Sequence, residues 1–442
     1  MSAVPRQARG QALVFLLPLL VVLAAAAWWA FETGQSVTEK RRLRDAADAA
    51  ALSGAVWQAR ALNFQSTMNR AIIANEAVIA QSVSLRSWSA YMDRMLPGAA
   101  AITSYVPYLN AAVSALQRWW TAFDRALQPS LAALEATTGA VERDLAAASR
   151  VMNAATLIVV PQVVRESVAA ADPRFELSSG GEAMLAAWAA DWARFSSLYG
   201  GAWRWRQQDV VYRSLDGFTA GRNFTLSPLL GSRLLRFEKR AGTELIDFET
   251  WRGLDTLSLH QPRYVVFGSM RERAALAWGG AEAGAGSVRR GAHGGAWSRN
   301  PRASRAASSS VQPQRAWSGL PSMYDLSAAQ RAEFDPPRVI VRLRLPDGSR
   351  RSAAALLGFD RVASVSGDLL RLGPQSGEGD LFADAAGSTD FRRPGRRRDG
   401  ATELPSLYSP YWRSALVAST DAERVAMAVL DGTPAWLAAV PR

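Results

Sequence analysis

The chain has 442 residues, of which 49% are hydrophobic, a formal net charge of +12 and no cysteine. The absence of cysteine excludes disulfide bonds, thiol catalysis and cysteine-ligated metals. Because His260 and His293 are the only histidines, a multi-histidine metal site is excluded, and a Ser-His-Asp site would have to use one of the two. We expect His260 to lie in a loop or packed in the core, and His293, within a Gly/Ser/Arg stretch, to be solvated.

Residues 10–31 carry no charged side chain and read GQALVFLLPLLVVLAAAAWWAF. As a helix such a run spans roughly 30 Å, the thickness of a bilayer's hydrocarbon core. We therefore predict an N-terminal tail and transmembrane anchor over residues 1–34. The alternative is a cleaved secretory signal that uses the small residues Ala24–Ala27 as its cleavage site. A retained anchor is favoured, because Trp28 and Trp29 extend the run and suit a membrane interface.

Residues 35–96 show a heptad pattern without charged residues in its seam. One column is Leu43, Ala50, Trp57, Phe64, Ala71, Val78, Leu85 and Met92, and the interleaved column is Ala47, Gly54, Ala61, Met68, Asn75, Ser82, Ser89 and Leu96. This spacing is typical of a helix that packs along a partner. We predict one helix of up to 62 residues, ended by Pro97. The partner along Leu43–Leu96 is either a later helix of this chain, which is favoured, or another subunit.

The segment RRLRDAADAAALSGA at residues 41–55, together with RGQA at residues 9–12 and the apolar run between them, resembles TadE/TadG-like proteins. The resemblance covers residues 7–56. That family is associated with assembly of Flp pili by the bacterial tight-adherence system. The resemblance implies a single-pass protein of the bacterial inner membrane with most of the chain in the periplasm. It also implies a non-enzymatic role beside other pilus or secretion assembly proteins.

The resemblance carries over no binding residues. Processed pseudopilins have Glu at the fifth position after the cleaved Gly, whereas Phe15 is fifth after Gly10. Some TadG-like proteins carry a von Willebrand factor A-like domain whose metal site needs Asp-x-Ser-x-Ser, and this sequence has no such run.

Residues 99–199 read as helical, with prolines at 107, 129, 161 and 173. We expect several helices that fold back on the long one, so that residues 35–200 form a helical periplasmic region.

Residues 201–442 read as a mixed α+β region, so the fold class of the whole chain is α+β. Strand-like runs are Tyr264–Phe267, Val339–Leu345 and Ala353–Phe359, and Arg424–Leu430 is a strand or a helix. Stretches rich in Gly, Ala, Ser and Arg bury little apolar area. They predict flexible loops near residues 270–319 and 373–403.

No motif indicates catalysis. The glycines at 279, 280, 284 and 286 lack the lysine of a phosphate-binding loop, so we interpret them as a loop. Asp247 and Glu249 alternate in a strand-like stretch and are interpreted as a solvated strand face. For Trp203-Arg204-Trp205-Arg206 we expect the two indoles to anchor the core. We assign no catalytic, cofactor-binding or metal-binding residue and no cofactor, and we expect a protein that is not an enzyme.

The excess positive charge is concentrated in two segments. Residues 271–315 contain eight arginines against two glutamates, and residues 391–398 contain five arginines and no acid. We interpret both as solvated loops, and a nucleic-acid partner is disfavoured. The alternative function is an anchored periplasmic module that binds an anionic polymer, DNA or acidic polysaccharide, through Arg289, Arg290 and Arg396–Arg398. Such binding would weaken steeply with salt.

Overall fold

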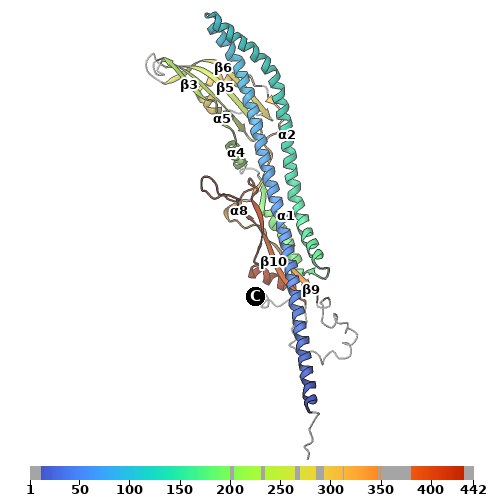
Figure 1. Cartoon of the computed structure of the whole chain (residues 1–442). Coiled ribbons are helices and arrows are strands. Elements are labelled where there is room, and N and C mark those ends of the chain that lie inside the picture. Colours follow the sequence, from blue (N-terminus) through green and yellow to red (C-terminus); the bar gives the residue numbers. More distant parts are fainter. Residues whose placement is uncertain are drawn as a thin grey trace, which may run out of the picture.

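Two long antiparallel helices form the axis of the molecule (Figure 1). The computed structural model describes residues 11–199, 204–229, 234–263, 269–284, 293–311, 313–346, 349 and 380–432. Helix α1 runs over Gln11–Thr103 and helix α2 over Pro107–Ala171. At 1.5 Å per residue they are about 140 Å and about 100 Å long. The N-terminal end of α1 extends beyond every other described element.

Most prolines in these helices do not end them, which corrects the sequence prediction. Helix α1 continues through Pro97 to Thr103, and α2 contains both Pro129 and Pro161. A proline removes one backbone hydrogen bond, and packing along a partner over many turns offsets that loss. The expected series of short helices is therefore one long helix. Pro173 does act as predicted. Helix α2 ends at Ala171, because a proline disfavours helical geometry at the residue before it.

Shorter helices and strands follow the hairpin. The helical segments are α3 Ser179–Phe195, α4 Arg204–Arg213, α5 Gly217–Ala220, η3 His293–Gly295, α6 Ala296–Arg299, α7 Pro301–Ser309, α8 Ala328–Ala332 and α10 Asp421–Leu430. The strands are β1 Glu176–Leu177, β2 Ser196–Leu198, β3 Phe224–Leu229, β4 Leu235–Ile246, β5 Thr250–Pro262, β6 Met270–Gly284, β7 Pro313–Gln314, β8 Tyr324–Leu326, β9 Val339–Leu345, β10 Leu381–Phe391 and β11 Trp412–Val417. The α+β fold class is confirmed.

The described strands form two main sheets that pack against α1 at different heights. One has the order β1-β9-β10-β11 and is antiparallel throughout. The other has the order β3-β4-β5-β6-β7, antiparallel except for the short parallel pair β6–β7. A two-stranded pair, β2-β8, lies apart from both sheets. Each sheet builds its own core with α1. The first core joins Leu43 and Leu62 to Trp188 and Val339, and the second joins Ile79 to Trp251 and Trp317.

The heptad seam of α1 is covered from within the chain. Every seam side chain from Leu43 to Leu96 is buried or half-buried. A Cβ at Gly54 would lie 3.0 Å from Val164 of α2, so the two helices approach closely there. Helix α2 is therefore the packing partner that the heptad predicts.

Part of the expected loop near residues 270–319 is ordered secondary structure, which corrects that prediction. Residues 270–284 form β6, where Ala277, Ala281 and Ala283 are buried, and α7 packs against the sheet. Small side chains supply little apolar area, but here they allow close packing against α1. In the second predicted loop, residues 381–391 form β10, whereas residues 392–403 have no regular structure.

The remaining fold predictions concern three strand-like runs, the segment at residues 424–430 and the domain boundaries. Val339–Leu345 is strand β9 as predicted, and Arg424–Leu430 belongs to helix α10. The predicted strands at 264–267 and 353–359 lie outside the described residues. The domain boundaries at residues 34 and 200 remain predictions.

We predict that Gly279→Ala destabilises the fold. A Cβ at Gly279 would overlap the backbone of Ser87 and Tyr91 in α1, because β6 and α1 touch main chain to main chain there. Overpacking of this kind costs about 1–3 kcal/mol of unfolding free energy, measurable by chemical denaturation. Gly98→Ala is the matched control, since its Cβ would have no neighbour within 4 Å. Equal stability of the two variants would contradict the packing described.

Candidate functional site

The first part of α1 is an apolar helix without a packing partner among the described residues. Phe15, Val22 and Trp29 are 76%, 63% and 55% exposed, whereas Leu43, a few turns later, is fully buried. By length and composition, α1 is one of two described helices apolar enough to cross a membrane, and α2 is the other. The exposed segment of α1 has the dimensions predicted for an anchor.

An ion pair marks the point where α1 enters the fold. Glu39 accepts a hydrogen bond from Arg174 at 2.9 Å, and Arg174 also pairs with Asp172 at 2.8 Å. Asp172 is the C-cap residue of α2. The side chain of Glu39 is 4% exposed, in contrast to the exposed segment before it. This contact fixes the start of the packed part of α1 to the end of α2.

The alanine-rich segment that follows forms a close-packing face. Ala47, Ala50, Ala51 and Ala55 are fully buried. A Cβ at Gly387 of β10 would overlap the backbone of Ala51. Small side chains are needed on this stretch of α1, because helix α2 and strand β10 both approach its backbone.

Residues 10–59 match the Tad family model, described as "Putative Flp pilus-assembly TadE/G-like". The resemblance seen in the sequence is confirmed for this N-terminal region. The matched residues comprise the exposed apolar segment, the Glu39 contact and the alanine face. Searches among curated proteins and among solved structures found no match.

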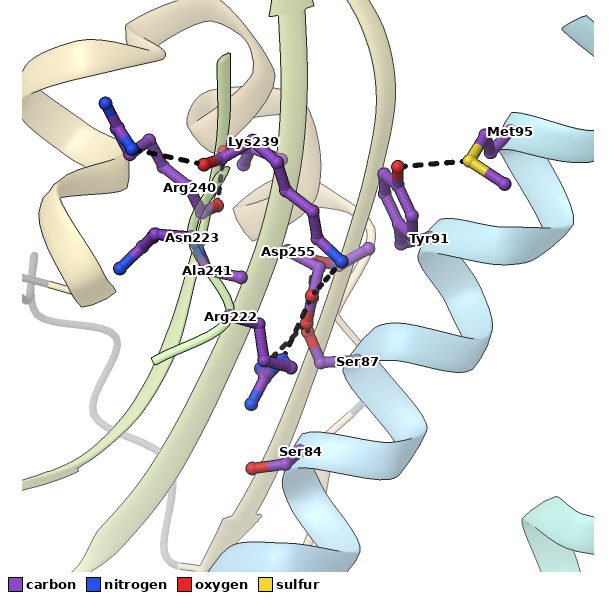
Figure 2. A network of polar contacts seen from close by, with 12 residues as sticks. Ser84, Ser87, Tyr91, Met95, Arg222, Asn223, Lys239, Arg240, Ala241 and Asp255 are labelled. Atoms are coloured by element: carbon purple, nitrogen blue, oxygen red, sulfur yellow. Dashed lines mark hydrogen bonds and ion pairs between the residues drawn. The ribbon is translucent and has the colours of Figure 1, made fainter. Parts of the chain in front are cut away.

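Farther along α1, a buried carboxylate joins the helix to the five-stranded sheet. Figure 2 shows Asp255 of β5 facing Ser87 of α1, which donates a hydrogen bond at 2.8 Å. Arg222 pairs with Asp255 at 2.8 Å, and Lys239 lies 3.4 Å from it. The Lys239 ammonium also lies over the ring of Tyr91, 4.3 Å from its centroid. Burial lowers the pKa of Lys239 and raises that of Tyr91 to about 12.

A second buried ion pair connects α1 to α2. Arg86 lies 3.1 Å from Glu135, which also accepts a hydrogen bond from Ser82 at 2.7 Å. Arg86 donates a further bond to the carbonyl of Glu282 in β6. Burial raises the pKa of Glu135, and the Arg86 charge opposes that rise. Because removing one partner of a buried ion pair is costly, this contact fixes the register of the two helices.

Two carboxyl groups meet in the core between α1 and α2. Glu76 accepts a hydrogen bond from the indole of Trp251 at 2.7 Å, and Glu142 accepts one from Trp317 at 2.9 Å. Burial raises the pKa of Glu76 well above its ordinary value, and repulsion from the neighbouring Glu142 is the second cause of this rise. Burial raises the pKa of Glu142 to about 8. At neutral pH Glu142 therefore retains its proton within the core.

These buried groups hold elements together, and their partners come from this chain. The described residues contain no cluster of three or more His, Cys, Asp or Glu side chains arranged to hold a metal ion. No motif in the sequence marks Asp255, Glu76 or Glu142 as buried polar groups. One signal was present: Asn69 and Glu76 continue a seven-residue spacing from Leu62 to Val83, so polar groups fall on a second buried face of α1.

The two histidines are both buried. His260 lies in β5 and contacts Asn300 through Nε2 at 2.9 Å, so the packed interpretation is confirmed. His293 is 1% exposed rather than solvated, which corrects the prediction. Burial lowers its pKa to about 3, so it is neutral at physiological pH. His293 lies in η3, which packs against β4, so the imidazole is buried although its neighbours in sequence are small.

The structure also differs, in whole or in part, from the sequence interpretation of the Trp-Arg segment, the acidic pair and the glycines. Trp205 lies in α4 and is 54% exposed, so it does not anchor the core, and Trp203 lies outside the described residues. Asp247 and Glu249 are solvated as expected, but they belong to the turn between β4 and β5 rather than to a strand. Asp247 there has φ of 52°. Gly279, Gly280 and Gly284 lie in β6 instead of a loop.

The arginine-rich segments give the binding alternative little support. Arg393 pairs with Glu403 at 2.9 Å and Arg397 with Asp399 at 2.7 Å. These four residues and Arg398 line a surface hollow of about 440 Å³. Arg289 and Arg290 lie outside the described residues. Polymer binding remains a prediction.

We predict that the Glu76–Glu142 pair makes the fold less stable as pH rises. The unfolded chain releases the Glu142 proton near the ordinary carboxyl pKa of about 4.5, whereas the folded protein retains it to about pH 8. Between these values Glu142 alone should lower the unfolding free energy by about 1.4 kcal/mol per pH unit. Glu142→Gln supplies a permanent donor and should flatten this slope in denaturation curves at several pH values. Glu166→Gln, on the exposed side of α2, should retain this slope. Identical slopes in both variants would contradict the proton retained by Glu142.

Proposed function

We propose that this protein is a non-enzymatic component of a pilus-assembly apparatus, anchored in the bacterial inner membrane by α1, with the rest of the chain in the periplasm. The match of residues 10–59 to the TadE/G-like family supports the assembly role. The observation that carries the proposal is that these residues contain both an exposed bilayer-length helix and the alanine face that holds it to the fold. The anchor and the scaffold are one continuous helix.

We propose that α1 crosses the membrane and α2 does not. The apolar part of α2 buries Val160, Val164 and Val168 against the first core. Arg165 on the same stretch pairs with Glu182 of α3 at 2.7 Å. A helix engaged with the folded region in this way cannot also be surrounded by lipid, so a single crossing fits the structure better.

An assembly role implies contacts with other pilus or secretion proteins. Buried charges fix the two helices and the sheets relative to one another, so the described region forms a rigid rod on the anchor. A rod of this kind presents binding surfaces at defined heights above the membrane.

Deletion of the gene in a piliated host should abolish surface pili, and the wild-type gene should restore them. Leu20→Arg places a charge at the centre of the proposed span, which costs about 2.5–3.5 kcal/mol of insertion free energy, and should reduce restoration. Val37→Arg is the control, because Val37 is also exposed at 63% but lies beyond the span. Pili would be counted by electron microscopy.

Normal piliation in the deletion strain would refute the assembly role. Full restoration by Leu20→Arg, with the protein still in the membrane fraction, would refute α1 as the anchor.

A further inference from the structure

Helix α2 carries an apolar stripe on its outward face. Two columns alternate at spacings of three and four: every seventh residue from 109 to 158, and every seventh from 112 to 154. We call these two columns the outer stripe. The second column is alanine except for Trp119, and Asp144 is the only charged residue in either. All positions are exposed except Ala140, which is half-buried.

Between residues 135 and 149 the inward face of the same helix carries several polar side chains. Glu135, Thr138, Glu142 and Ser149 are buried, whereas Leu116, Val151 and Ile158 are 46%, 68% and 70% exposed. The ion pair of Arg86 and the carboxyl pair fix the rotation of α2, so the helix cannot turn its apolar side inward. Exposed apolar faces of this extent mark interaction sites.

We propose that the outer stripe binds the same stripe of a second copy of this chain, as a parallel and in-register helix pair. The orientation rests on the proposed function: two chains anchored in one membrane point the same way and stand at the same height. In a parallel pair each core position meets its own counterpart, so an apolar heptad is complementary to itself.

The charges of the stripe fit this pairing. In parallel knobs-into-holes packing, the Asp144 side chain enters a hole formed by residues 140, 143, 144 and 147 of the other copy. Residue 143 is an arginine and is exposed. Each Asp144 therefore lies beside the opposite Arg143, which balances the two carboxylates. Ala140 and Ala147 complete the hole and allow close approach.

The size of the stripe is sufficient for a stable dimer. It extends roughly 75 Å along α2 and is about 10 Å wide, which gives on the order of 750 Å² for each copy. Stable interfaces bury about 800 Å² per partner. The stripe alone reaches that scale.

Cysteine cross-linking of the full chain in native membranes tests the pairing, and the natural chain contains no cysteine to interfere. Thr137→Cys and Val151→Cys place a thiol in the first column, where parallel counterparts meet within disulfide distance. Both should form dimers under mild oxidation at least tenfold more than Arg125→Cys, which is exposed on α2 away from the stripe. Adding Val151→Asp to Thr137→Cys should reduce the dimer at least tenfold. Val151 is 68% exposed, so this change leaves the monomer fold intact.

Equal cross-linking at 125 and 137 would overturn the proposal, as would a Thr137→Cys product that contains a different protein. Absence of dimers from both Thr137→Cys and Val151→Cys would also overturn it, because a parallel, in-register pair brings each of these positions beside its own counterpart. The piliation test is independent: cross-linking without any effect of gene deletion on pili would retain the dimer and refute the assembly role. Pilus loss on gene deletion, with no cross-linked dimer, would retain the assembly role and refute the dimer.

Discussion

Helix α1 is buried from two sides, and its contacts position both α2 and the two main sheets. From Glu39 onward this helix is covered by α2 on one side and by the strands of two sheets on the other. The first stretch of that covering requires small side chains, because β10 and α2 both approach the backbone near Ala51 and Gly54. Residues 10–59, which match the family model, include this stretch together with the exposed segment before it. One helix thus links a bilayer-length apolar segment to a folded body.

Buried charges determine how the elements meet along α1. Asp255 ties the sheet to the helix, Glu135 ties α2 to it, and the pair of Glu76 and Glu142 occupies the contact of all three. Apolar packing alone would tolerate sliding between long helices, whereas a buried ion pair penalises every register but one. The result is a rod of defined length that exposes the outer stripe of α2.

Much of the long helix could be predicted from its sequence, and much of the C-terminal half could not. The uncharged run and the heptad are local patterns, so residues 10–31 and the seam from Leu43 to Leu96 are readable directly. The local pattern predicts helix breaks at Pro97, Pro129 and Pro161, and this prediction is wrong. The effect of a proline on a helix depends on packing against distant segments, which a local pattern does not contain. For residues 270–284 the local pattern predicts a loop, because alanine and glycine indicate flexibility. The close approach of the α1 backbone at Gly279, which orders this segment as a strand, is not visible in that pattern. The partners of Glu76, Glu142 and Asp255 are far away in sequence, so their pairing depends on the tertiary fold.

We propose that a single helix is both membrane anchor and scaffold. The most direct test is membrane fractionation of a C-terminally tagged protein, with protease accessibility in spheroplasts and N-terminal sequencing of the mature chain. An intact N-terminus in the membrane fraction, with a tag that external protease removes, is the result we predict. A chain cleaved near Ala27 and released from the membrane would contradict the claim, because the scaffold would then function without its anchor.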